Sequence, residues 1–231
     1  MAHSDTIDIM DSAAPQAPQP TAKRALPPYP TREPVPGSTR APRLRAARRA
    51  GYALAALTLL AIPATLLVHS DAGAGQVRLG AATFVVVSLL DVVVAYYLWR
   101  LTRRRAPRSG SIAAATRVAA SAIQGVAAGG LLLSSSDNPG AVARFESWWG
   151  ASLLVFGLHL IVLTTALRVN RAPLFVLGGT AAAGAAYLLD ALPDTARVLD
   201  AQVLLPFMFG ELLLLAWLLL VGPRGRVRDT A

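Results

Sequence analysis

The stretch that decides the fold is Phe207–Gly222, which reads FMFGELLLLAWLLLVG and contains one charged residue, Glu211. A run this apolar is typical of a membrane-spanning helix, because a helix satisfies its own backbone hydrogen bonds in lipid. A carboxylate near the middle of such a helix is costly, and ionisable residues inside spans are functional candidates by default. The sequence therefore predicts a membrane protein with polar groups held among apolar helices.

The composition of the whole chain supports a membrane location. Hydrophobic residues make up 54% of the sequence, and the mean hydropathy is +0.49. There is no cysteine, which excludes disulfides, thiolate metal sites and cysteine nucleophiles. Arginine outnumbers lysine, of which Lys23 is the sole example, and together with abundant alanine this favours a bacterial source.

Six apolar runs are each long enough to cross a bilayer core of roughly 30 Å as a helix. They cover residues 52–68, 81–101, 111–133, 148–169, 172–192 and 203–222. The predicted fold is therefore an all-α membrane protein, with a bundle of six transmembrane helices over residues 51–222.

The segments outside this bundle are polar. Residues 1–40 contain PQAPQP and LPPYP and too few large apolar groups to offset the entropy of ordering, so we expect a disordered cytoplasmic tail. This tail lacks the apolar core of a signal peptide. Residues 41–50 form a basic juxtamembrane segment, and residues 223–231 form a second basic tail.

The distribution of basic residues predicts the orientation. With six spans, 18 of the 22 Lys and Arg residues fall on one side of the membrane, and this side includes both termini. Basic loops stay in the cytoplasm, so we expect a multi-pass protein of the inner (plasma) membrane with both termini cytoplasmic. The net charge of +9 thus reflects topology, and no nucleic-acid partner is expected because the interleaved aromatic platforms of such proteins are missing. The basic run Arg40–Arg49 is expected to meet anionic lipid headgroups.

Four ionisable residues lie inside predicted spans: Asp91, Arg117, His159 and Glu211. Three of them fall ten or eleven residues before the inner end of a span, which is about 15 Å deep and near the midplane. We expect an Asp91–Arg117 pair, since a short loop joins their helices, and a His159–Glu211 pair. Gln124 in the third span and Trp217 in the sixth are secondary candidates.

Each of these residues also has a purely structural interpretation. Asp91 and Arg117 would then form a clasp, or Arg117 would extend to the cytoplasmic surface. His159 would be a satisfied core histidine, and Glu211 a neutral, hydrogen-bonded carboxyl. A buried carboxylate that changes protonation state is equally what a proton-coupled carrier uses.

Small residues predict where helices approach closely. Gly125 and Gly129 lie four residues apart in the third span, on the same face as Arg117. The fifth span repeats the pattern with Gly178, Ala182 and Ala186. Both faces are expected to point into the bundle.

The sequence argues against several kinds of site. Only one of its three histidines is inside a span, which disfavours a bis-histidine haem, and no HExxH, GxSxG or P-loop motif is present. Asp190, Asp194 and Asp200 share a predicted outer loop, where a weak cation site is less favoured than a solvated acidic loop. We expect no metal and no cofactor.

The second half of the chain contains three short motifs. They are Phe156–Leu160 (FGLHL), Arg171–Leu174 (RAPL) and Gly210-Glu211-Leu212 followed by Trp217-Leu218-Leu219 and Gly222. In these motifs the chain resembles the domain of unknown function 4386 family. Asp91 and Arg117 also fit the pattern, and the match covers roughly residues 50–222. It implies a bacterial multi-pass membrane protein whose activity is uncharacterised.

Two functions follow as hypotheses. The first is a carrier for a small solute, with proton coupling through Asp91 and Glu211 as one form of it. The alternative is a non-catalytic scaffold or regulatory protein that acts through a partner docked on the proline-rich tail. An intramembrane enzyme is less favoured, because no nucleophile or metal set accompanies His159.

Overall fold

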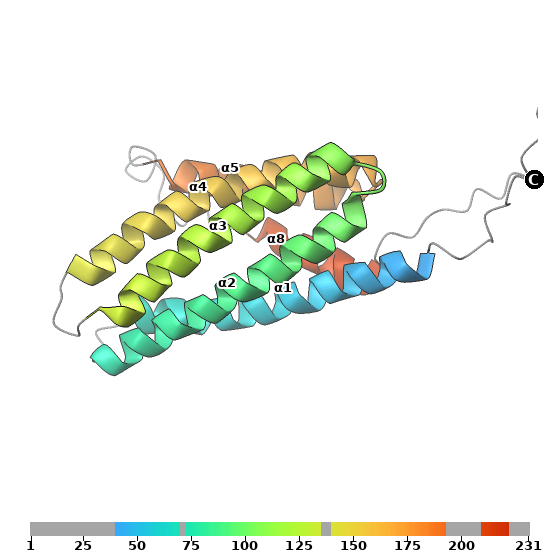
Figure 1. The fold of residues 1–231 in the computed structure, drawn as a ribbon. Helices are drawn as coiled ribbons and strands as arrows, with labels where there is room; N and C mark the ends of the chain where they lie inside the picture. Colours follow the sequence, from blue (N-terminus) through green and yellow to red (C-terminus); the bar gives the residue numbers. More distant parts are fainter. Residues whose placement is uncertain (1–39, 70–72, 135–139, 193–208, 222–231) are drawn as a thin grey trace, which may run out of the picture. The chain divides into compact units, whose positions relative to one another are not determined.

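The computed structural model describes residues 40–69, 73–134, 140–192 and 209–221, and its helices cover almost all of them (Figure 1). The elements are α1 (Arg40–His69), α2 (Ala74–Thr102), α3 (Pro107–Leu133), α4 (Gly140–Val169), α5 (Leu174–Asp190), α8 (Gly210–Ala216) and the π-helical turn η1 (Trp217–Val221). No strand occurs in these ranges, which confirms the all-α class. Most of the predicted N-terminal tail, the C-terminal tail, and Asp194 and Asp200 lie outside them.

Four of the helices, α1 to α4, are long and apolar enough to cross a membrane, and α5 and the segment Gly210–Leu220 are shorter apolar helices. Their surfaces also fit lipid. On α2, the side chain of Leu89 is 64% exposed, whereas that of Asp91 is 5% exposed. An exposed apolar surface around buried charges is unfavourable in water and favourable in a bilayer, so the chain is a membrane protein.

Several helices begin earlier than the hydropathy predicts. α1 starts at Arg40, so the basic segment 41–50 forms its first turns and is continuous with the apolar part. Ala47 and Ala50 within this segment are fully buried. α4 begins at Gly140, eight residues before the predicted start. Polar and alanine-rich turns extend these helices because tertiary contacts stabilise them, which a hydropathy window cannot detect.

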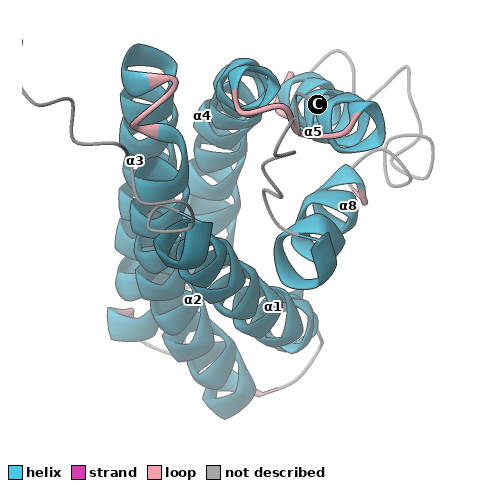
Figure 2. Cartoon of the chain, turned by 90° about the vertical axis from the view of Figure 1, so that its right-hand side faces the viewer, coloured by secondary structure: helices cyan, strands magenta, loops and turns pink. Residues whose placement is uncertain are grey.

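The helices pack in chain order. α2 contacts α1 and α3, α4 contacts α3 and α5, and α8 contacts α5. The end-on view of Figure 2 shows α8 beside both α5 and α1, and α1 also contacts η1. The last two described elements, α8 and η1, thus pack against the first helix.

Two apolar clusters fill the interior at different levels. The first apolar cluster includes Leu54, Leu98, Leu160, Val176 and Leu218. The second apolar cluster includes Ala64, Phe84, Ala128, Leu131 and Phe145. Along α2, members of the second cluster precede Asp91 and members of the first cluster follow it. A layer between the two clusters is therefore left for polar side chains.

Glycines allow α4, α5 and α8 to approach closely. A Cβ atom on Gly157 would lie 2.8 Å from the carbonyl oxygen of Gly184, and one on Gly184 would lie 2.9 Å from that of Gly157. Gly179 and Gly210 bring the backbones of α5 and α8 together in the same way, since a Cβ atom added to either glycine would meet the backbone of the other. Each contact permits a backbone approach that any larger residue would prevent.

The predicted small-residue faces are correct only in part. Gly125 does face Ser88 of α2, since a Cβ atom added to this glycine would lie 3.5 Å from the serine Cβ. Gly129 and Gly178, however, have open space around them. In α5 the close contacts instead involve Gly179 and Gly184, because a helix this rich in glycine and alanine offers several equivalent small faces.

The turn after α4 positions α5. Arg171 has a φ of 60°, a left-handed conformation that commonly ends a helix. The amide of Ala172 donates to the carbonyl of Leu167, and that of Arg171 donates to the carbonyl of Arg168. Pro173 then begins the next helix. The RAPL motif therefore encodes a helix stop followed by a helix start.

We expect Gly157→Ala to lower the free energy of unfolding of the detergent-solubilised protein by roughly 1–3 kcal/mol, and with it the melting temperature. The reason is that the new methyl group would meet the backbone of α5. Gly129→Ala is the matched control, since nothing lies within 4 Å of the position that its new methyl group would take. Equal melting temperatures for the two variants would contradict the packing described for α4 and α5.

Candidate functional site

Three of the four predicted ionisable residues meet in the layer between the apolar clusters. α2 contributes Asp91, α3 contributes Arg117, and α4 contributes His159. Their exposed fractions are 5%, 1% and 1%. We call these three residues, with Ser121, the polar cluster.

Asp91 and Arg117 form the expected ion pair. The guanidinium donates to Oδ1 of Asp91 from Nε, at 2.9 Å, and also from Nη2. Ser121 lies one turn after Arg117 on α3. Its hydroxyl oxygen is 3.0 Å from Oδ2 of Asp91 and 2.8 Å from the backbone carbonyl oxygen of Arg117, and its one proton is shared between these two acceptors. Both carboxylate oxygens are therefore occupied, as burial of a charged pair requires.

His159 completes the coordination of Arg117. The Nη1 group of Arg117 lies 3.2 Å from Nε2 of His159, and Nδ1 of His159 lies 2.6 Å from the backbone carbonyl oxygen of Ala113. Because arginine can only donate, Nε2 must accept, and the ring proton must reside on Nδ1 and donate to Ala113. This arrangement assigns a neutral imidazole to His159.

The expected His159–Glu211 pair is wrong. Both ring nitrogens of His159 are already occupied, one by Arg117 and the other by Ala113. Arginine supplies donors at several points of a plane, so a single guanidinium reaches Asp91 and His159 at once. Arg117 thus supplies both the positive charge that Asp91 needs and the N–H donor that Nε2 of His159 accepts from.

Phe156 also belongs to the site, although a search of the sequence for polar residues does not find it. The guanidinium carbon of Arg117 lies 5.0 Å from the centre of its ring, and the His159 ring centre lies 5.6 Å from it. The Phe156 ring also approaches that of Tyr187 of α5 edge-on, with the ring centres 5.3 Å apart, and it packs against the first apolar cluster. The spacing of three between Phe156 and His159 on one helix is the signal that places both on one face.

The polar cluster is a closed network. Each of its charged or ring groups has hydrogen-bond partners inside the protein, and together they carry no net charge. Such a network joins α2, α3 and α4 through side chains of all three helices. Its geometry is that of a structural clasp.

Glu211 differs from the polar cluster in its hydrogen bonding. It lies in the first turn of α8, and its Oε1 atom is buried without a hydrogen-bond partner. Arg117 and Asp91 are both within electrostatic range of its carboxyl group, as Glu211 is of Tyr187. Glu211 therefore neighbours the polar cluster without joining its hydrogen bonds.

A second buried oxygen without a partner occurs on the neighbouring helix. The Oγ1 atom of Thr180 on α5 is fully buried and makes no hydrogen bond. Thr180 follows Gly179, and Glu211 follows Gly210, the two glycines at which α5 and α8 touch. α5 and α8 thus each carry one buried oxygen atom with unused hydrogen-bonding capacity, which is a costly feature in a protein interior.

The secondary candidates do not extend the site. Trp217 is 3% exposed and belongs to the first apolar cluster, where it packs as a core residue. Gln124 is half-buried on α3, and no hydrogen bond joins it to the polar cluster. Within the described ranges, no group of three His, Asp or Glu residues is placed to hold a metal ion.

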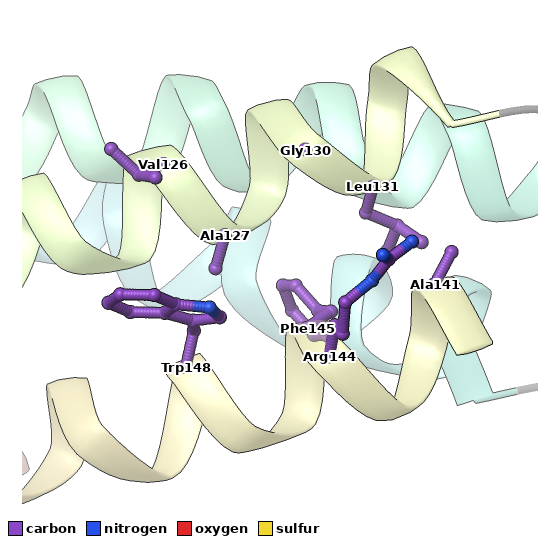
Figure 3. A pocket seen from close by; sticks show the side chains of 8 residues that line it. All are labelled: Val126, Ala127, Gly130, Leu131, Ala141, Arg144, Phe145 and Trp148. Carbon is purple, nitrogen blue, oxygen red and sulfur yellow. The ribbon is translucent and has the colours of Figure 1, made fainter.

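A separate cavity of about 360 Å³ lies between α3 and α4 (Figure 3). Its walls are Val126, Ala127, Gly130, Leu131, Ala141, Arg144, Phe145 and Trp148. The figure shows the Arg144 side chain extended between the two helices, with the Trp148 indole further along α4. Neither the polar cluster nor Glu211 lines this cavity.

Comparison with known proteins gives one match. The model of the family described as Domain of unknown function (DUF4386) matches residues 49–222, which confirms the resemblance seen in the sequence. The chain matches no curated protein and no solved structure.

Proposed function

The chain belongs to the DUF4386 family of domains of unknown function, and from its buried groups we propose that it is a membrane carrier in which Glu211 binds and releases a proton. The observation that carries this proposal is the buried Oε1 atom of Glu211, which has no hydrogen-bond partner. An unpaired carboxylate is expensive to bury, so this group requires a proton or a cation when it is enclosed. Thr180 supplies a second unpartnered oxygen on the adjoining helix.

The polar cluster restricts which carboxylate can take this role. Asp91 is held by Arg117 and Ser121, so releasing it would leave a buried arginine without its counter-charge. The buried Oε1 atom of Glu211 has no such bond to break. We therefore assign proton binding to Glu211 alone and a structural role to Asp91, and a small solute would move with the proton.

We further propose six spans in the cytoplasmic membrane of a bacterium, with both termini cytoplasmic. The helices that carry the basic segments support this arrangement, because Arg43 at the start of α1 donates to Oδ1 of Asn170 at the end of α4, at 2.8 Å. Arg49 of α1 likewise lies over the ring of Tyr97 near the end of α2. These ends share one side, where Arg40–Arg49 would face anionic headgroups.

Single cysteines test this topology, because the natural sequence has none. In intact cells, a membrane-impermeant maleimide should label Gln76→Cys, at the start of α2. It should label Arg104→Cys, after α2, only once the membrane is permeabilised. The reverse pattern would reject the proposed orientation.

Transport is tested in proteoliposomes loaded with a pH-sensitive dye and challenged in turn with small cations, amines and carboxylates. We expect the wild type to move protons with at least one of these solutes, and Glu211→Gln to lose that flux, because an amide cannot bind and release the proton. Glu146→Gln is the matched control, since Glu146 is exposed and its carboxylate lies 3.6 Å from Nε2 of His69.

Retention of flux by Glu211→Gln would reject the role given to this residue. A wild type that behaves like protein-free liposomes with every solute would favour the alternative, a scaffold or regulatory protein that acts through a partner.

A further inference from the structure

A basic pocket of about 270 Å³ lies between the start of α1 and the end of α2. It is lined by Pro42, Arg45, Ala46, Arg49, Tyr97 and Arg100, and we call it the arginine pocket. None of these residues is acidic, and no carboxylate in the described part of the chain pairs with the three arginines. The pocket therefore gathers positive charge that no carboxylate of the described residues neutralises.

Aromatic rings hold two of these arginines in place. Arg49 lies 5.9 Å from the centre of the Tyr97 ring. Arg100 lies 5.8 Å from the centre of the Tyr96 ring and donates to its hydroxyl at 3.4 Å. Stacking on a ring orients a guanidinium and leaves most of its N–H donors free. Arginines fixed in this way present paired donors that match the oxygens of a phosphate.

The surroundings of the pocket match those of a lipid phosphate. Tyr96, Tyr97 and Trp99 lie close together near the end of α2, and aromatic residues of this kind concentrate at the level of the headgroups. Tyr96 and Trp99 also line an apolar groove of about 640 Å³ between α2 and α3. The groove is otherwise formed by small and apolar side chains of both helices, such as Val92 and Val118. An acyl chain attached to a phosphate at Arg100 would thus have a groove within reach.

We propose that the arginine pocket binds the phosphate of an anionic phospholipid of the cytoplasmic leaflet, with one acyl chain in the adjoining groove. The inference rests on the proposed orientation, which places this end of α1 and α2 at the cytoplasmic surface. It does not depend on proton transport. A phospholipid bound in the arginine pocket would contact both α1 and α2 and so hold the two helices together.

The test is native mass spectrometry of the full chain in detergent, titrated with phosphatidylglycerol and, separately, with phosphatidylcholine. We expect selective retention of phosphatidylglycerol by the wild type. The triple variant Arg45→Gln, Arg49→Gln, Arg100→Gln should lower that affinity by at least roughly tenfold more than its control, because the bidentate contacts are lost. The control is Arg104→Gln, Arg105→Gln, Arg108→Gln, which removes three exposed arginines that do not line the pocket.

Three outcomes would overturn the proposal. Equal losses in the two triple variants would mean that diffuse charge attracts the lipid without a pocket. Equal retention of both lipids by the wild type would show no preference for an anionic headgroup. Displacement of phosphatidylglycerol by millimolar inorganic phosphate would identify a site for free phosphate. None of these outcomes bears on flux through Glu211, so failure here and failure of the carrier proposal are distinguishable.

Discussion

A guanidinium that is 1% exposed, in a bundle whose outer surface is apolar, must find partners for its N–H groups inside the protein. Arg117 meets this constraint with donations to Asp91 and to His159, and with the ring of Phe156 against its guanidinium. These contacts fix the rotation and the depth of α2, α3 and α4 relative to one another. A shift of α2 or α3 would separate the charged pair, and a shift of α4 would break the hydrogen bond between Arg117 and His159. Apolar contacts in lipid supply little of this specificity, since lipid chains are as apolar as leucine.

The rest of the arrangement follows from that layer. One apolar cluster packs on each side of it, and glycines at positions 157 and 184 bring α5 against α4. A second glycine contact brings α8 against α5, next to Glu211 and Thr180. The polar cluster and Glu211 thus differ in their hydrogen bonding. The cluster is joined by hydrogen bonds among its own members, whereas the buried Oε1 atom of Glu211 has no hydrogen-bond partner.

Much of this could be predicted from the sequence, and the failures have physical causes. Hydropathy identified every described helix, and the cost of isolated charge in lipid correctly paired Asp91 with Arg117. The same argument paired His159 with Glu211 and was wrong, since hydropathy and depth do not reveal that one arginine can serve two partners. Phe156 and the backbone of Ala113 were not foreseen because neither is polar by residue type. The predicted contact face of α5 was right for the buried Ala186 and wrong for Gly178, because the small residues of this helix are nearly interchangeable in sequence. The paired glycines and the arginine pocket depend on which faces meet, and only the fold supplies that.

The central claim is that Asp91 and Arg117 hold α2 and α3 together as a unit. It is tested most directly by a double-mutant cycle in detergent, with unfolding free energies measured for Asp91→Asn, Arg117→Gln and the double variant. We predict that each single variant loses about 3–5 kcal/mol, because it leaves a buried group without its partner, and that the double variant loses far less than the sum. Additive losses, or single variants as stable as the wild type, would contradict the claim.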